Sequence, residues 1–149
     1  MDLNQITSQI IKAAINVHKE LGPGLLESVY QACMEIELKD MKLKVEPEVA
    51  LPVFYRRQRV AEEGFRIDLL VEDEIIVELK SVEQIQPVHK KQLLTYLRLE
   101  NKPLGLLINF NQMMLRDGVT RIINDPSHTG HTELSEVSVN SNEGNEWAR

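Results

Sequence analysis

Cysteine, long apolar runs and positive charge are all scarce in this chain. One cysteine, Cys33, rules out an internal disulfide, and no cysteine and histidine spacing fits a structural zinc site. Cys33 falls at an apolar helical position, where we expect a buried thiol. No apolar run approaches the ~18 residues that a membrane helix needs, so we expect no membrane partner. The first residues lack the pattern of a signal peptide, so we expect a cytoplasmic protein.

Basic residues are outnumbered, with 17 Lys and Arg against 23 Asp and Glu, which gives a net charge of −6. Such a chain is not expected to hold a polyanion over a broad surface. The charge does not exclude an enzyme acting on nucleic acid, because carboxylates that hold a metal ion count as negative until the metal binds.

Composition divides the chain into two parts. Residues 1–125 have the apolar content of a single folded domain, and their number suits one core. Residues 126–149 are rich in Ser, Thr, Asn, Gly and Glu and hold few large apolar side chains. A segment of this kind cannot offset its ordering entropy, so we expect a flexible, disordered polar tail.

The hydrophobic pattern predicts an α/β domain in the order ααβββαβ(β), with a mixed β-sheet flanked by helices. Asp2 and Gln5 have the spacing of a capping box for the first helix. Pro47 and Pro52 suggest an edge strand or a pair of short pieces, since proline removes ladder donors. The predicted elements are helices at 2–21 and 25–39, extended segments at 44–60, 64–71 and 75–80, a helix at 87–101, and strands at 104–110 and 118–123.

The hairpin at 64–80 carries the strongest sign of a functional site. It reads as two strands joined by an acidic turn, with Asp68 in the first strand and Glu78 and Lys80 in the second. Strand side chains alternate between faces, so Glu78 and Lys80 lie on one face, within reach of Asp68. Two carboxylates on an apolar hairpin are costly to bury unless they are paired or bind a metal.

These residues resemble the core of the PD-(D/E)XK nuclease superfamily, in which an aspartate precedes a Glu-x-Lys strand. Gly24, Glu27 and Tyr30 resemble the signature of the GxxExxY protein family within it. The resemblance covers the chain from Ile6 to Ile123 and implies a restriction-endonuclease-like core. Ile67 stands where the superfamily name has proline, as in many members.

The resemblance implies a metal-dependent nuclease and assigns roles to the hairpin. Asp68, Glu78 and the main-chain carbonyl of Leu79 would bind Mg²⁺ (or Mn²⁺), which prefers oxygen ligands. Lys80 would orient or deprotonate the attacking water. Glu27 would complete the carboxylate set or hold a second metal. Alternatively, Glu27 lies in the first turn of its helix, where a carboxylate favours the dipole and free amides.

Other residues are predicted to act on the substrate. Gln92 and Tyr96 resemble a glutamine and a tyrosine that position phosphate or water in some members, although they could form a plain helix surface stripe. His89 could contact phosphate or cap its helix. Arg56 and Arg57 could touch the nucleic-acid backbone, or form a solvated basic turn. The last predicted contact is Tyr30, whose alternative role is packing with its hydroxyl hydrogen-bonded.

The resulting hypothesis is a nuclease that hydrolyses nucleic-acid phosphodiester bonds, with DNA as the expected substrate. An alternative is a binding or protein-interaction module that keeps the nuclease scaffold without turnover, which the acidic charge favours. A third hypothesis is a homodimer whose paired sites create the binding groove.

Overall fold

The computed structural model describes residues 1–125 and 136–137, and the predicted tail at 126–149 lies otherwise outside the described residues. A six-stranded mixed sheet runs in the order β1-β2-β3-β4-β5-β6. Only β3 and β4 pair in parallel, whereas the other neighbours are antiparallel. The strands are β1 (Val45–Tyr55), β2 (Gln58–Val71), β3 (Ile75–Lys80), β4 (Leu104–Asn109), β5 (Val119–Ile123) and β6 (Glu136–Val137).

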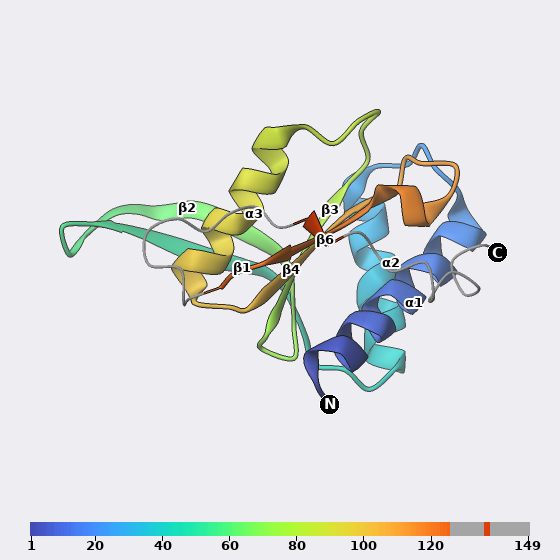
Figure 1. Ribbon diagram of the computed structural model, residues 1–149, viewed down its shortest axis with the longest axis horizontal. Helices are drawn as coiled ribbons and strands as arrows, with labels where there is room; N and C mark the ends of the chain where they lie inside the picture. The colour runs from blue at the N-terminus through green and yellow to red at the C-terminus, as the bar shows by residue number, and fades with distance from the viewer. Residues whose placement is uncertain (126–135, 138–149) are drawn as a thin grey trace.

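Helices cover both faces of the sheet (Figure 1). The helices α1 (Leu3–Leu21) and α2 (Glu27–Asp40) pack on one face, and α3 (Pro87–Glu100) packs on the other. Because β3 and β4 are parallel, the chain must cross over between them, and α3 makes that crossover. The element order ααβββαβ(β) and the restriction-endonuclease-like α/β fold are therefore confirmed, with a 3₁₀ turn, η1 (Leu115–Gly118), before β5.

The two apolar faces of the sheet form two cores. The core under α1 and α2 includes Leu69, Val77 and Leu79, while Leu70, Ile76 and Leu107 face α3. Successive residues of a strand therefore point to opposite helical layers, as the alternation of strand side chains requires. Glu78 consequently shares the α3 face with Ile76, within β3.

The helix ends follow the signals in the sequence. The Asp2 carboxylate accepts the N–H of Gln5, and the Gln5 side chain accepts the N–H of Asp2, so the predicted capping box is present. Pro87 occupies the first turn of α3, where its missing N–H costs nothing, and Asn101 ends this helix in the left-handed conformation. Cys33 is half-buried against the α1–α2 core, so the thiol is less enclosed than expected.

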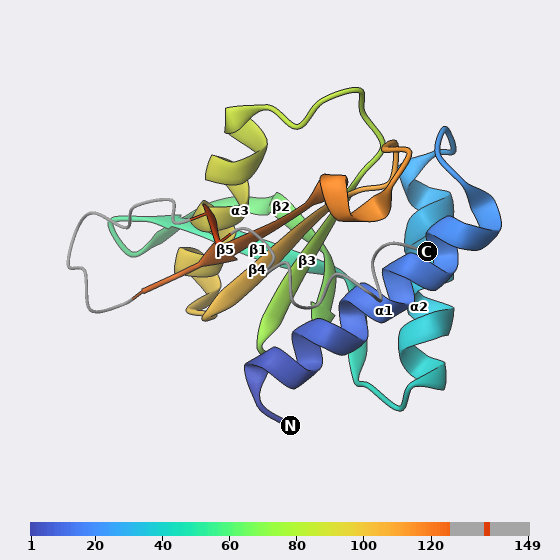
Figure 2. The ribbon, with the colours of Figure 1, turned by 45° about the vertical axis from the view of Figure 1, so that its right-hand side comes forward.

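The strands β1 and β2 form a long hairpin at the edge of the sheet, and its tip extends beyond α3 (Figures 1 and 2). Both prolines of β1 lie inside one strand, so the edge-strand alternative is correct and the two short pieces are not. The register shifts on either side of Val53, next to Pro52. Arg56 and Arg57 connect Tyr55 to Gln58, both with positive φ (50° and 66°).

No helix among the described residues is both long and apolar enough to cross a membrane.

The Arg56–Arg57 turn predicts a stabilising substitution. A two-residue hairpin turn with positive φ at both positions favours Asn-Gly, because other residues pay a steric cost in the left-handed region. The double variant Arg56→Asn, Arg57→Gly should therefore raise the free energy of unfolding by about 1 kcal/mol. Urea denaturation of the parent and the variant measures this change, and a less stable variant would contradict the turn geometry.

Candidate active site

The candidate site lies where β2 and β3 part. Their backbone pairing runs from Val71 and Ile75 to Leu69 and Val77 and is not continued beyond this point. There the side chains bond to the backbone across the gap. The Asp68 carboxylate accepts the N–H of Leu79 at 2.8 Å, and the Glu78 carboxylate accepts the N–H of Asp68 at 3.1 Å. These reciprocal bonds hold both carboxylates at the opening between the strands.

The two carboxylates share a poorly hydrated site, where burial disfavours the negative charge of both and the charge of Asp68 further disfavours that of Glu78. Burial, and then the charge of Asp68, raise the pKa of Glu78 from its ordinary 4.5 to about 9. Burial also raises the pKa of Asp68, against the opposing effects of the Leu79 amide, Glu78 and Lys80. The Glu78 side chain is 7% exposed. Without a cation, the pair therefore retains a proton at neutral pH.

Two neighbouring residues of β3 add further polar groups near the carboxylates: Lys80 its ammonium group, and Leu79 its main-chain N–H and carbonyl. The Lys80 side chain is half-buried, and its positive charge lowers the pKa of both carboxyls. The Lys80 carbonyl accepts the N–H of Phe110, on the β4 side. The N–H and carbonyl of one strand residue point to the same neighbouring strand, and successive residues alternate, so the Leu79 N–H and carbonyl face β2. The structure thus brings Asp68, Glu78, Lys80 and the Leu79 carbonyl together.

Tyr96 reaches the same site from α3. Burial, and then the charges of Glu78 and Asp68, raise the pKa of Tyr96 to about 12. The hydroxyl therefore stays protonated and can donate a hydrogen bond. The Tyr96 side chain is also hydrogen-bonded to Gln92, one turn earlier on the helix. Tyr96 is buried and hydrogen-bonded to Gln92, so it is not part of a solvated surface stripe, and a role of the two residues at the site stays a prediction.

His89 is held at the start of α3. Its Nδ1 lies 3.0 Å from the backbone nitrogen of Gln86 and accepts that N–H. The ring therefore caps the helix, as the alternative interpretation expected, and Nδ1 is not available to substrate in this arrangement. A phosphate contact through Nε2 stays a prediction.

Glu27 contacts the end of β3 from the other layer. The carboxylate of this first residue of α2 accepts the N–H of Ser81 at 3.3 Å. The Ser81 hydroxyl donates to the Leu25 carbonyl at 2.6 Å. The α1–α2 connection is thereby attached to the residue that follows Lys80. Within 1–125 and 136–137, no three acidic, histidine or cysteine side chains gather as metal ligands, so Glu27 does not join one carboxylate set with Asp68 and Glu78.

The predicted substrate contact of Tyr30 disagrees with the position of this residue in the structure. Its side chain is fully buried, and its ring stacks on Phe110 with centroids 4.4 Å apart. The hydroxyl donates to the Gly22 carbonyl at 2.6 Å and accepts the N–H of Leu25 at 3.1 Å. The predicted substrate contact is therefore wrong for this structure, because the hydroxyl is already engaged on both sides and closes the connection between α1 and α2.

Asn109 is a supporting residue that the sequence analysis missed. It is fully buried at the end of β4, beside Lys80 in the parallel register. Its side chain accepts the N–H groups of Val82 and Asn111 and donates to the Val82 carbonyl. These bonds fix the path of the chain just after Lys80. A polar residue ending the apolar run at 104–110 was the available signal, because a buried amide must find partners.

Arg56 and Arg57 are not part of the carboxylate site. They form the tip of the β1–β2 hairpin, with the Arg56 guanidinium over the Tyr55 ring at 5.3 Å. Arg57 precedes Asp68 by eleven residues, in the turn before β2, whereas Asp68 lies near the other end of that strand. Contact of these arginines with a nucleic acid stays a prediction.

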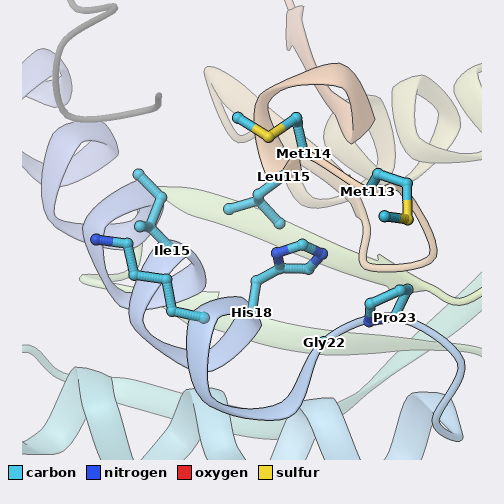
Figure 3. Close-up of a pocket in the computed structure, with 8 residues that line it drawn as sticks. Ile15, His18, Gly22, Pro23, Met113, Met114 and Leu115 are labelled. Carbon is cyan, nitrogen blue, oxygen red and sulfur yellow. The ribbon is translucent and has the colours of Figure 1, made fainter. Parts of the chain in front are cut away.

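A cavity of about 250 Å³ lies elsewhere, on the side of α1. Figure 3 shows residues around it from α1, from the Gly22–Pro23 connection and from the loop before β5. His18 lines it, with Nε2 2.7 Å from the Gln112 carbonyl oxygen. The carboxylates do not line this cavity, so its size is not a guide to the chemical site.

The donor groups of the site fit a hard divalent cation. Mg²⁺ prefers oxygen ligands and is bound by one or two carboxylates plus waters. Asp68, Glu78 and the Leu79 carbonyl form such a set. Burial and the charge of Asp68 raise the pKa of Glu78, and a cation at the carboxylates would favour their ionised forms.

Residues 4–122 match the family model of the PD-(D/E)XK nuclease superfamily. No curated protein and no solved structure matches the chain. The superfamily resemblance is confirmed, and the GxxExxY assignment stays a prediction.

The raised pKa of Glu78 predicts how the stability of the metal-free protein depends on pH. Glu78 loses its proton near pH 4.5 when unfolded and near 9 when folded, so between these values the folded state binds more protons. The contribution of Glu78 to the free energy of unfolding is fully present below pH 4.5. It falls by roughly 1.4 kcal/mol per pH unit above that value and is lost by about pH 9.

Urea denaturation in EDTA, at several pH values in this range, measures the effect. Glu78→Gln keeps the shape and cannot titrate, so its stability should change less with pH than that of the parent. Parallel curves for the two proteins would show that Glu78 is not the titrating group.

The hydrogen bonds of Tyr30 predict a cost for removing one oxygen atom. Tyr30→Phe removes two part-buried hydrogen bonds, to the Gly22 carbonyl and from the Leu25 N–H, which should cost about 1–3 kcal/mol of stability at about 0.5–1.5 kcal/mol each. Tyr55→Phe is the matched control, since Tyr55 is exposed and should change stability by under ~0.5 kcal/mol. Equal stability of the two variants in thermal unfolding would disprove the closure by Tyr30.

Proposed function

Because the chain belongs to the PD-(D/E)XK nuclease superfamily, we propose that it is a metal-dependent nuclease that hydrolyses phosphodiester bonds, with DNA as the substrate. The single observation that carries this proposal is the carboxylate pair at the opening between β2 and β3. Asp68 and Glu78 are held there by backbone N–H groups although their shared burial opposes their ionisation.

The unfavourable electrostatics of this pair support a functional role. Two carboxylates kept for stability alone would be placed in water or paired with cations, since buried like charges weaken a fold. Groups with strongly shifted pKa values gather at sites that bind or react. The position of Lys80 next to the pair adds a group that can act on a proton or on developing negative charge.

Each residue then has a distinct role. Asp68, Glu78 and the Leu79 carbonyl hold Mg²⁺ or Mn²⁺, which when bound neutralises charge on the phosphoryl oxygens and favours a hydroxide-like nucleophile at neutral pH. Lys80 orients the attacking water and stabilises the negative charge that develops on the phosphate. The protonated hydroxyl of Tyr96 donates a hydrogen bond to the substrate phosphate or to water. Gln92 holds that hydroxyl in place through their hydrogen bond.

Glu27 and Asn109 serve as positioning residues. Glu27 binds the amide of Ser81, and Asn109 binds the backbone at Val82, so both fix the segment that directly follows Lys80. A shift of this segment would move the lysine relative to the carboxylates. Misplacement of a reacting group by about 1 Å can cost a hundredfold in rate.

Substitution of Lys80 tests the proposal. End-labelled single- and double-stranded DNA is incubated with the parent and with Lys80→Ala, each in Mg²⁺, Mn²⁺ or EDTA. The parent should cut with metal only, and Lys80→Ala should cut about 10²- to 10⁴-fold more slowly, because it lacks the group that acts on the water. Asp68→Asn and Glu78→Gln should remove metal-dependent cutting.

Lys91→Ala is the matched control, since Lys91 is exposed on α3 outside the site and its removal should leave the rate unchanged. A contaminating nuclease would cut equally in all preparations. DNA binding without cutting by the parent would replace the nuclease by a non-catalytic binding module, the alternative that the acidic net charge favours.

A further inference from the structure

The tip of the β1–β2 hairpin, residues 54–60, differs in charge from the rest of the chain. We call this segment the arm. It holds three arginines and no acidic residue, although the whole chain carries a net charge of −6. The arm projects past α3 at the edge of the sheet (Figures 1 and 2). Positive charge is thus concentrated on an extension away from the acidic site.

Aromatic rings accompany these arginines. Phe54 is 58% exposed and Tyr55 is 62% exposed, on successive residues and hence on opposite faces of the arm. Val60 is also more than half exposed. Single exposed apolar residues are ordinary, but two large rings beside three arginines form a cluster. Rings and guanidinium groups together provide stacking surfaces and phosphate contacts.

The turn itself keeps its arginines against a conformational preference. Both Arg56 and Arg57 have positive φ, where Asn and Gly are favoured in two-residue hairpins. Conformations of this kind tend to persist where a side chain has a function. Among the described residues, the contact found for this pair is the stacking of Arg56 on the Tyr55 ring at 5.3 Å.

The arm is continuous with the candidate active site. Phe65, on β2 between the arm and Asp68, is partly exposed, and its ring lies 5.3 Å from the ring of Tyr96. Tyr96 in turn faces the carboxylates. Aromatic side chains therefore occur at the site, beside it and at the far end of the same β1–β2 hairpin.

We propose that the arm binds a single strand of nucleic acid that continues from the bond at the Asp68–Glu78 pair. Bases stack on Phe65 and on an exposed ring of the arm, and Arg56 and Arg57 contact phosphates. This inference rests on the proposed nuclease function. A single strand is favoured over a duplex because stacking on a side chain requires an unpaired base, and because the acidic body offers little charge for gripping a duplex.

Binding to oligothymidylate of about 16 nucleotides, at several salt concentrations, tests the arm. All proteins carry Lys80→Ala so that the probe is not consumed. The double variant Arg56→Asn, Arg57→Gly removes two positive charges and places residues that favour positive φ in the turn. Loss of folding therefore cannot explain its effect. This variant should reduce the salt slope of log K by about 1.4, for two phosphate contacts.

The rings are tested by Phe54→Ser, Tyr55→Ser, which should weaken binding about 5- to 100-fold if a base stacks on either ring. Lys12→Gln, Lys39→Gln is the matched control. It removes the same charge from the exposed surfaces of α1 and α2, on the opposite face of the sheet, and should have less effect than the arm substitutions.

The length of the substrate separates this inference from the proposed function. With Lys80 restored, the arm variants should cut long single strands more slowly, while strands of about 4 nucleotides, too short to reach the arm, are cut at the parental rate. Cutting by the parent with no effect of any arm variant would disprove the arm and leave the nuclease. Arm-dependent binding without cutting by the parent would disprove the nuclease instead.

Two further results would overturn the inference. Equal losses of affinity for a duplex and for the single strand would show that stacking on unpaired bases is not involved. The other is a contact between copies of this chain through the arm. In that case, sedimentation would show a parental dimer that Phe54→Ser, Tyr55→Ser dissociates, with oligothymidylate affinity unchanged.

Discussion

The site depends on two reciprocal hydrogen bonds between β2 and β3. The Asp68 carboxylate accepts the N–H of Leu79, and the Glu78 carboxylate accepts the N–H of Asp68. Each carboxylate replaces a backbone partner that the parting strands no longer provide. The bonds satisfy two N–H groups that would otherwise be buried without a partner. They also force two acidic groups to share a poorly hydrated space, which raises the pKa of both. The carboxylates that complete the backbone hydrogen bonding are thus the same groups whose pKa is raised.

Elements on every side of the sheet support this opening. Asn109 at the end of β4 and Glu27 at the start of α2 bind the backbone that follows Lys80. Tyr30 closes the connection that precedes α2, and thereby sets where Glu27 begins its helix. Glu27 and Tyr30 therefore join the α1–α2 connection to the residue that follows β3, and Tyr30 does so from within the core.

The sequence allowed prediction of those features that local pattern determines. Apolar periodicity gave the element order, and the alternation of strand side chains placed Glu78 and Lys80 on one face with Asp68 in reach. It did not identify Asn109 or the hydroxyl partners of Tyr30, because these contacts join segments far apart in the chain. The length of the arm was also missed, since Pro47 and Pro52 are compatible with either a broken or a continuous edge strand.

The net charge says little about any one surface, because it averages over surfaces that differ. The carboxylates that make the protein acidic include the pair at the site, whose charge a divalent cation would offset. The arm, in contrast, holds three arginines without an acidic residue in 54–60. Electrostatic attraction is screened over about 8 Å at physiological salt, so a polyanion near the arm would respond to the local charge more than to the total. An acidic chain can thus carry a basic extension that is separate from its buried carboxylates.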